Sequence, residues 1–253
     1  MRYFIEIAYK GTHYAGWQIQ ENAQSVQAEI EKALCISLRE PISITGSGRT
    51  DTGVHASQQF AHFDTEQPIT YQKIRSWNAL LPADITIKNI FRVDDKAHTR
   101  FDATERSYQY KIIHEKNPFL KDLATLELAV LQIDKMQEAA QKILLYDDFE
   151  SFSKVKANVK NFKCKIKKAH WFYEKDSISG VNLLIFEITA NRFLWGMVRA
   201  IVGTLLDVGK KKIEISDFEK IIEERNRAKA SSAAPPQGLY LSKITYPYPL
   251  IKI

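Results

Sequence analysis

The chain has 253 residues, which is enough for one large domain or for two of ordinary size. Hydrophobic residues make up 45% and charged residues 26%, the balance of an ordinary soluble protein. No run of about 18 apolar residues occurs, which excludes a membrane-spanning helix, and the net charge of +6 suits a polyanionic partner.

The cysteines and histidines indicate neither a disulfide framework nor a metal site. Cys35 and Cys164 have no nearby cysteine, and the six histidines show no ligand spacing. We therefore expect two reduced thiols, no metal and a cytoplasmic protein. The first ten residues alternate apolar and polar types and carry Glu6, unlike a signal peptide.

The apolar periodicity predicts interleaved strands and helices. Alternation predicts strands over residues 2–10, 41–45, 58–63, 84–93, 107–113, 162–167, 181–190 and 238–246. Helical spacing predicts helices over 25–38, 70–81, 134–146 and 193–209, and a further helix opened by a capping box at Ser216 and Glu219. Residues 228–236, rich in Ala, Ser and Pro, are expected to form a flexible loop.

Both halves of the chain have a similar element order, without the Gly-rich turns of a parallel nucleotide-binding sheet. This order favours an α+β fold of two similar subdomains that share a mostly antiparallel sheet. The predicted subdomains are residues 1–104 and residues 105–253.

One stretch, residues 46–56, crowds three glycines around an Arg and an Asp: Gly46-Ser47-Gly48-Arg49-Thr50-Asp51-Thr52-Gly53-Val54-His55-Ala56. Such a run predicts a tight loop that presents Arg49 and Asp51 on a fixed scaffold. The residues alone leave two interpretations open, a catalytic loop or a turn with a solvated ion pair. Asp51-Thr52-Gly53 also spells the aspartic-protease triplet, but that mechanism needs a second carboxylate, and no second Asp-Thr-Gly or Asp-Ser-Gly occurs.

The stretch resembles the catalytic loop of the tRNA pseudouridine synthase A family, Gly-x-Gly-Arg-Thr-Asp-x-Gly-Val-His-Ala, at every fixed position. The resemblance runs nearly end to end, and further matching motifs are Gly16-Trp17-Gln18-x-Gln20, Asn78-x-Leu80-Leu81-Pro82, Arg106-x-Tyr108-x-Tyr110, Phe193-x-x-x-Met197-Val198-Arg199 and Gly238-Leu239-Tyr240-Leu241. It implies the family's fold, with a catalytic cleft between the two subdomains.

The resemblance also implies an activity, the isomerisation of uridine to pseudouridine at positions 38 to 40 of the tRNA anticodon stem-loop. Asp51 would be the catalytic aspartate, attacking C1′ of the ribose or removing a proton from C2′; both routes stay open. An ionised carboxylate suits either route at neutral pH without activation. No cofactor is implied, tRNA is the partner, and the family acts as a homodimer.

The resemblance gives roles to four more residues. Arg199 would pair with Asp51, Tyr108 would lie against the target base, and Leu239 would line the uracil pocket. Without the resemblance, the default interpretation is an exposed helix residue for Arg199 and a core residue for both Tyr108 and Leu239. Arg49 would either stay beside Asp51 or contact the RNA.

A run of lysines without any acid covers residues 154–168: Lys154, Lys156, Lys160, Lys163, Lys165, Lys167 and Lys168. Alternation on a strand would place Lys163, Lys165 and Lys167 on one side, a surface that could follow RNA phosphates. The alternative is a solvated face. A catalytically silent RNA-binding module on the same fold is the second function considered, and the presence of Asp51, Tyr108 and Arg199 counts against it.

Overall fold

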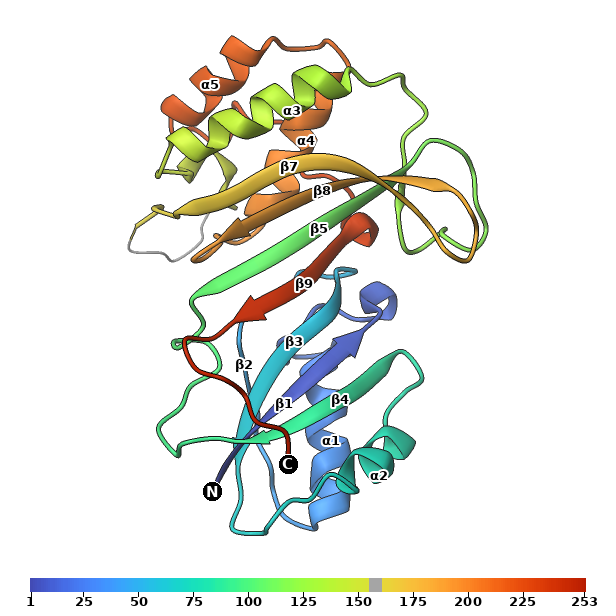
Figure 1. Ribbon diagram of the computed structural model, residues 1–253, viewed down its shortest axis with the longest axis vertical. Helices are drawn as coiled ribbons and strands as arrows, with labels where there is room; N and C mark the ends of the chain where they lie inside the picture. The colour runs from blue at the N-terminus through green and yellow to red at the C-terminus, as the bar shows by residue number, and fades with distance from the viewer. Residues whose placement is uncertain (155–160) are drawn as a thin grey trace. The chain divides into compact units, whose positions relative to one another are not determined.

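The computed structural model describes residues 1–154 and 161–253. Contacts between Cα atoms divide the chain into two compact units (Figure 1). The first unit contains Met1–Glu105 and Tyr240–Ile253, and the second contains Arg106–Leu239. The predicted subdomains, residues 1–104 and residues 105–253, stay a prediction.

The first unit is a twisted sheet with strand order β4-β1-β3-β9 (Figure 1). Its strands are β1 (Arg2–Tyr9), β3 (His55–Asp64), β4 (Ile85–Arg92) and β9 (Leu239–Thr245, of which Leu239 is counted in the second unit), with the short β2 (Thr45–Gly46) paired to β3. β1 is antiparallel to β3 and β4, whereas β9 runs parallel to β3. Helices α1 (Val26–Leu38) and α2 (Lys73–Leu80) cover one face of this sheet.

The ends of these helices follow from local sequence. The Ser25 hydroxyl accepts a hydrogen bond from the Ala28 N–H at 3.3 Å and so caps α1. α2 ends before Pro82, which disfavours helical backbone in the residue that precedes it. Ile74, Trp77 and Leu81 are buried, as the periodicity predicts.

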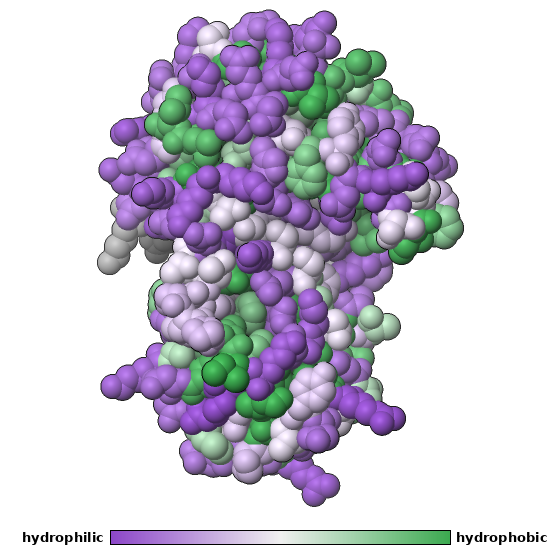
Figure 2. Space-filling view, viewed as in Figure 1, coloured by the Kyte–Doolittle hydropathy of each residue, from purple (hydrophilic) through white to green (hydrophobic). Residues whose placement is uncertain are grey.

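The second unit is built on β5 (Glu105–Ile113), β8 (Asn182–Ala190) and β7 (Ile166–Lys175), which pair antiparallel in that order. The short β6 (Thr125–Leu126) pairs parallel to β5. Three helices pack together beside β7 and β8 (Figure 1): α3 (Ile133–Lys142), α4 (Met197–Gly209) and α5 (Ile215–Glu223). Hydrophilic side chains predominate on the visible surface over α3 and α5 (Figure 2).

The α+β class is confirmed, because both units combine helices with mostly antiparallel strands. Four local predictions are wrong. Residues 41–44 form no strand, β7 begins only at Ile166, and α4 begins at Met197 instead of residue 193. The capping box of α5 pairs Glu214 with Asp217, two residues before the predicted one.

Candidate active site

The aspartate loop, residues 46–56, connects β2 to β3 and is bonded to the strand that follows it. The Ser47 N–H donates to the Phe60 carbonyl at 2.8 Å, and the Ser47 hydroxyl donates to the Gln59 amide oxygen at 2.5 Å. The Gln59 amide nitrogen then donates to the Gly48 carbonyl at 3.0 Å. Ser47 and Gln59 are both buried. These contacts fix the first part of the loop, and the sequence pattern gave no sign that Gln59 contributes to it.

The middle of the aspartate loop packs against residues 9–17. Thr50 is held at two atoms, because its hydroxyl bonds the Tyr9 hydroxyl at 2.8 Å and its carbonyl accepts from the Trp17 N–H at 3.2 Å. Gly16 allows this approach. Its φ is +95°, and a Cβ there would lie 2.3 Å from the Thr50 carbonyl oxygen. The backbone that enters Asp51 is therefore held by backbone contacts.

The last part of the loop is bonded to the same segment. The Gly53 N–H donates to the Tyr14 carbonyl at 3.3 Å, and His55 Nδ1 accepts from the Gly11 N–H at 2.9 Å. The His55 ring is 1% exposed and lies 4.7 Å from the Tyr240 ring, centroid to centroid. His55 thus acts as a structural residue that ties the loop to the segment before α1.

The two charged side chains of the loop differ in exposure. Asp51 is half-buried, whereas Arg49 is exposed. Within residues 1–154 and 161–253, Arg49 makes no hydrogen bond or ion pair. The role of Arg49, beside Asp51 or on the RNA, stays a prediction.

Tyr108 lies on β5 in the second unit, opposite Ile188 of β8. Its half-buried ring meets Phe193 edge to face, with centroids 5.1 Å apart and planes at 89°. Tyr110, two residues along, is fully buried, and its hydroxyl bonds Thr125 at 2.7 Å and the Pro235 carbonyl at 2.9 Å. Tyr110 is therefore a core residue, and Tyr108 keeps part of its ring at the surface of its unit.

Arg199 lies on α4, where the loop of residues 228–236 holds it. Its Nε donates to the Ala234 carbonyl at 2.7 Å, and the Ala234 N–H donates to the Arg199 carbonyl at 2.9 Å. Gly203, one turn further along, permits this packing, since a Cβ there would lie 2.1 Å from the Ser232 carbonyl oxygen. Gly196 does not lie inside the helix as predicted: it precedes α4 with φ +74°.

Leu239, the first residue of β9, is 5% exposed. Asp51 and Arg49 thus belong to the first unit, and Tyr108, Arg199 and Leu239 to the second. The pairing of Asp51 with Arg199 stays a prediction.

The lysine run is less regular than its sequence suggests. Lys163 and Lys165 precede β7, and a register shift between Ile166 and Lys168 leaves both Lys167 and Lys168 exposed. Lys156 and Lys160 lie outside the described residues. Lys163 and Lys165 therefore do not lie on the strand as predicted, but Lys163, Lys165 and Lys167 are exposed and alternate with buried Cys164 and Ile166. Their contact with RNA stays a prediction.

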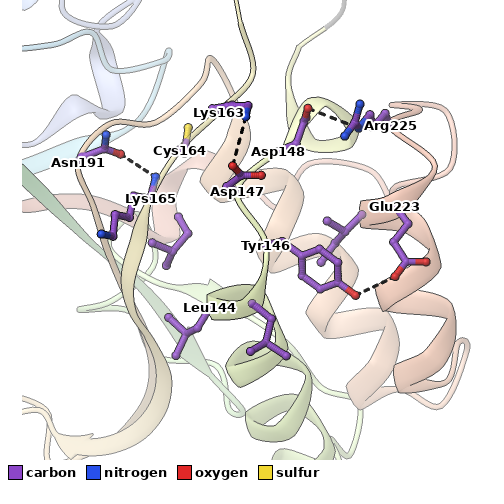
Figure 3. Close-up of a pocket in the computed structure, with 13 residues that line it drawn as sticks. Leu144, Tyr146, Asp147, Asp148, Lys163, Cys164, Lys165, Asn191, Glu223 and Arg225 are labelled. Carbon is purple, nitrogen blue, oxygen red and sulfur yellow. Dashed lines mark hydrogen bonds and ion pairs between the residues drawn. The ribbon is translucent and has the colours of Figure 1, made fainter.

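Acidic residues from other segments accompany these lysines. Lys163 Nζ lies 3.5 Å from Asp147, and Lys168 Nζ lies 2.5 Å from Glu187. Lys163 and Lys165 line a pocket of about 660 Å³ that also holds Asp147, Asp148, Glu223 and Arg225 (Figure 3). The charge of this surface is therefore mixed.

Within the described part of the chain, no three His, Cys, Asp or Glu side chains group as metal ligands. The helices described in residues 1–154 and 161–253 include none that is long and apolar enough to cross a membrane. Cys164 is a buried free thiol, and burial raises its pKa to about 11, so it is neutral at pH 7.

Comparison with known proteins places these features in a family. The family model described as tRNA pseudouridine synthase matches residues 6–102 and 139–247. The tRNA pseudouridine synthase A of Bacteroides fragilis is 48% identical over 248 residues, which cover 97% of this chain and 96% of the relative.

Two further relatives carry the same name. The protein of Parabacteroides distasonis is 44% identical over 254 residues, covering 100% of this chain and 98% of the relative. That of Porphyromonas gingivalis is 43% identical over 249 residues, covering 97% of each. The chain belongs to the tRNA pseudouridine synthase family.

Proposed function

We propose that this protein isomerises uridine to pseudouridine in tRNA, with Asp51 as the catalytic carboxylate. The observation that carries the proposal is the aspartate loop: Thr50 is held at its hydroxyl and its carbonyl, so the backbone presents Asp51 in one position. A fixed carboxylate is what attack on a single ribose carbon requires. The relatives' shared name, tRNA pseudouridine synthase A, supports the substrate.

The reaction rearranges bonds within one nucleotide. The bond from C1′ to uracil N1 breaks, the base turns, and a bond from C1′ to C5 forms. The C5 proton leaves and N1 gains a proton, so atoms and charge balance without a redox step. The Asp51 carboxylate starts the sequence either by attack on C1′ or by removal of the C2′ proton.

The remaining side chains bind and orient the nucleotide in this proposal. Tyr108 stacks on the uracil, which suits a base taken out of its helix, and Leu239 lines the pocket around it. Arg199 pairs with Asp51 and favours the ionised carboxylate. The exposed Arg49 either stays beside Asp51 or contacts the RNA where the base has left the stack, and Lys163, Lys165 and Lys167 add sequence-independent attraction to phosphates.

The target is the anticodon stem-loop of tRNA at positions 38 to 40, and the working form is a cytoplasmic homodimer. Both statements rest on the family resemblance. Light scattering of the purified protein tests the dimer, and sequencing of pseudouridine in treated tRNA tests the positions.

The deciding experiment incubates the protein with unmodified tRNA and measures pseudouridine by nucleoside analysis. Asp51→Asn is expected to reduce turnover by at least about 10³-fold while tRNA binding is kept, because affinity rests mostly on phosphate contacts. Asp134→Asn, an exposed carboxylate at the start of α3, is the matched control and is expected to behave as the wild type. Tight tRNA binding without any pseudouridine from the wild type would instead indicate an RNA-binding module, and turnover by Asp51→Asn would remove Asp51 from the mechanism.

A further inference from the structure

Trp195 is placed unlike the other tryptophans of the chain. Trp17, Trp77 and Trp171 are 2%, 0% and 7% exposed, whereas Trp195 is 52% exposed. An indole ring is the largest apolar side chain, and exposing half of it gives up burial that stabilises folding. Burial in the second unit therefore does not by itself account for a tryptophan at this position.

A lysine holds the Trp195 ring in place. Lys154 Nζ lies 3.8 Å from the ring centroid, a cation–π contact, and the Lys154 N–H donates to the Trp195 carbonyl at 2.9 Å. One part of the indole is thus covered by a positive charge, and the exposed remainder faces solvent. An aromatic surface beside a fixed cation is the arrangement that unpaired nucleotides recognise, by stacking and by phosphate attraction.

The turn that carries Trp195 is itself rigid. At its start, Asn191 exchanges two hydrogen bonds with Lys165: its N–H donates to the Lys165 carbonyl at 3.2 Å, and its Oδ1 accepts from the Lys165 N–H at 2.8 Å. Arg106 Nη1 donates to the Asn191 carbonyl at 2.9 Å. At its end, Leu194 is buried and accepts from the Met197 N–H at 3.2 Å. The ring is therefore presented by a fixed backbone, which lowers the entropy cost of binding.

The same turn reaches Tyr108. Phe193 touches the Tyr108 ring edge to face at 5.1 Å, and two residues along a chain separate Cα atoms by at most about 7 Å. One short turn of the second unit therefore carries both Trp195 and the ring that packs on Tyr108, the residue that meets the target uracil in the proposed function.

We propose that Trp195 and Lys154 form a second nucleotide-binding site, which stacks an unpaired base next to the isomerised uridine and attracts its phosphate. The ligand class is a single-stranded RNA nucleotide, without preference for one base because every base has a π-face. This inference rests on the proposed function, and it adds a binding residue for the RNA that the aspartate loop, Tyr108 and Leu239 do not supply.

Intrinsic fluorescence tests the site directly, because Trp195 is the one exposed tryptophan of the four. Acrylamide is expected to quench this residue in the free protein, and saturating tRNA is expected to protect it. Trp195→Phe removes the quenchable signal and serves as the blank. Quenching that stays unchanged by tRNA would overturn the inference.

Binding variants provide the second measurement. Trp195→Ala is expected to weaken tRNA binding roughly 5- to 150-fold, the range for loss of one stacked base, whereas Trp195→Phe keeps most of the affinity. Lys154→Met is expected to lower the slope of log K against log salt by about 0.7 to 0.9. Tyr173→Ala, which removes another exposed ring of the same unit, is the control and should bind as the wild type does.

The two proposals fail in different ways. If the wild type makes no pseudouridine, the proposed function is wrong. If it makes pseudouridine but Trp195→Ala, shown to be folded by its unfolding curve, binds tRNA as tightly as the wild type, the inference about Trp195 is wrong and the proposed function stands.

Discussion

Gly16→Ala tests whether the aspartate loop is placed by close backbone contact. The φ of +95° costs a residue with a Cβ about 1 to 2 kcal/mol, since L side chains rarely adopt it. The new methyl group would lie 2.3 Å from the Thr50 carbonyl oxygen, and ordinary contact begins at 3.4 Å, so the two segments must separate by about 1 Å. Such overpacking costs about 1 to 3 kcal/mol.

The expected loss is therefore about 2 to 5 kcal/mol of the free energy of unfolding, a large share of the roughly 5 to 15 kcal/mol of a typical domain. Urea unfolding followed by circular dichroism measures it. Pseudouridine formation at saturating tRNA should fall about 10²-fold, because the displaced segment carries Asp51 and errors of about 1 Å have this effect on catalysis.

Gly48→Ala is the matched control for stability. A Cβ at Gly48 meets nothing within 4 Å, so the free energy of unfolding should change by less than about 0.5 kcal/mol. A Gly16→Ala protein with the wild-type urea midpoint, or a Gly48→Ala protein destabilised as much, would refute the reasoning.

Three further predictions concern charge. Arg199→Lys should lower turnover about 10- to 100-fold, because lysine lacks both the planar fork and the Nε that donates to Ala234; unchanged turnover would make Arg199 a structural residue. Replacing Lys163, Lys165 and Lys167 together with Ala should weaken tRNA binding and lower the slope of log K against log salt by about 0.7 to 0.9 for each lysine that contacts a phosphate. Lys163 should contribute least, because it is paired with Asp147. An unchanged slope would indicate that the lysine run is a solvated face. Burial lowers the pKa of His62 to about 4, so the contribution of His62 to folding stability is fully present above the unfolded pKa of about 6.5 and is lost as the pH falls. The free energy of unfolding should therefore fall by about 2 kcal/mol from pH 7 to pH 4.5, as urea midpoints would show. A His62→Gln protein with the same pH dependence would assign the effect to other groups.

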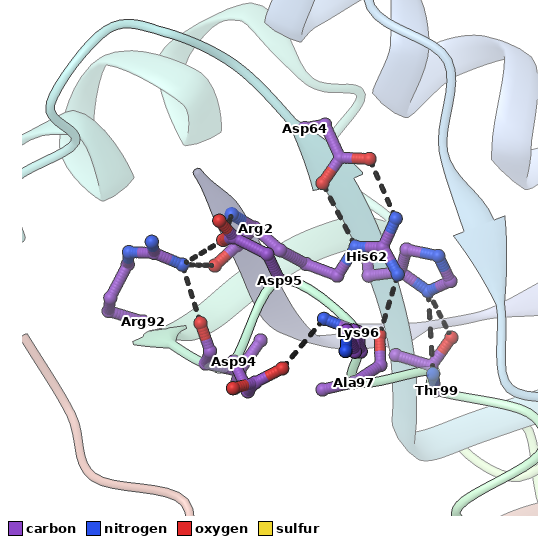
Figure 4. Close-up of polar contacts among 10 residues, drawn as sticks. Arg2, His62, Asp64, Arg92, Asp94, Asp95, Lys96, Ala97 and Thr99 are labelled. Atoms are coloured by element: carbon purple, nitrogen blue, oxygen red, sulfur yellow. Dashed lines mark hydrogen bonds and ion pairs between the residues drawn. The ribbon is translucent and has the colours of Figure 1, made fainter.

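His62 lies in a polar network of the first unit that explains this pKa (Figure 4). Its Nδ1 lies 2.8 Å from the Thr99 hydroxyl, and the ring is 6% exposed. Arg2 lies nearby, paired with Asp64 at 2.7 Å, and its positive charge also disfavours a second cation. The neutral imidazole is therefore the folded form, and the network favours it over the physiological pH range.

Sequence patterns predicted those strands and helices whose backbone amide groups form the regular hydrogen bonds of a sheet or a helix. They failed at residues 41–44 because the amides there take side-chain partners on α1. The Ile42 N–H donates to Cys35 Sγ at 3.1 Å, and the Ile44 N–H donates to Glu31 at 2.9 Å. Ile42 and Ile44 are buried as their alternation indicates, yet burial of alternate residues does not require a strand.

The lysine run shows a second limit. Its fifteen residues contain no acid, but Asp147 and Glu187 approach it from other parts of the chain. The start of β7 is delayed for a similar reason, because the Asn191 side chain takes the Lys165 N–H that a strand partner would otherwise accept. Both effects are contacts between distant residues, which no local pattern contains.

The loop of residues 228–236 shows a third limit. Its Ala, Ser and Pro content predicts a loop, and a loop forms. The same composition suggests flexibility, yet the Ala234 carbonyl accepts from Arg199 Nε, the Ala234 N–H donates to the Arg199 carbonyl, and the Ser231 hydroxyl donates to Asp207 at 2.7 Å. Small residues here serve close packing on α4, a role that composition does not distinguish from mobility.

In both candidate catalytic regions, a glycine permits a close approach of two backbone segments. Gly16 lets the Thr50 carbonyl approach the segment before α1, and Gly203 lets the Ser232 carbonyl rest on α4 beside the loop that holds Arg199. In each case a site residue is positioned by backbone atoms, whose geometry does not depend on the rotamers of core side chains. It follows that conservative changes of core side-chain volume should leave the site residues in place, whereas one methyl group at either glycine should move them.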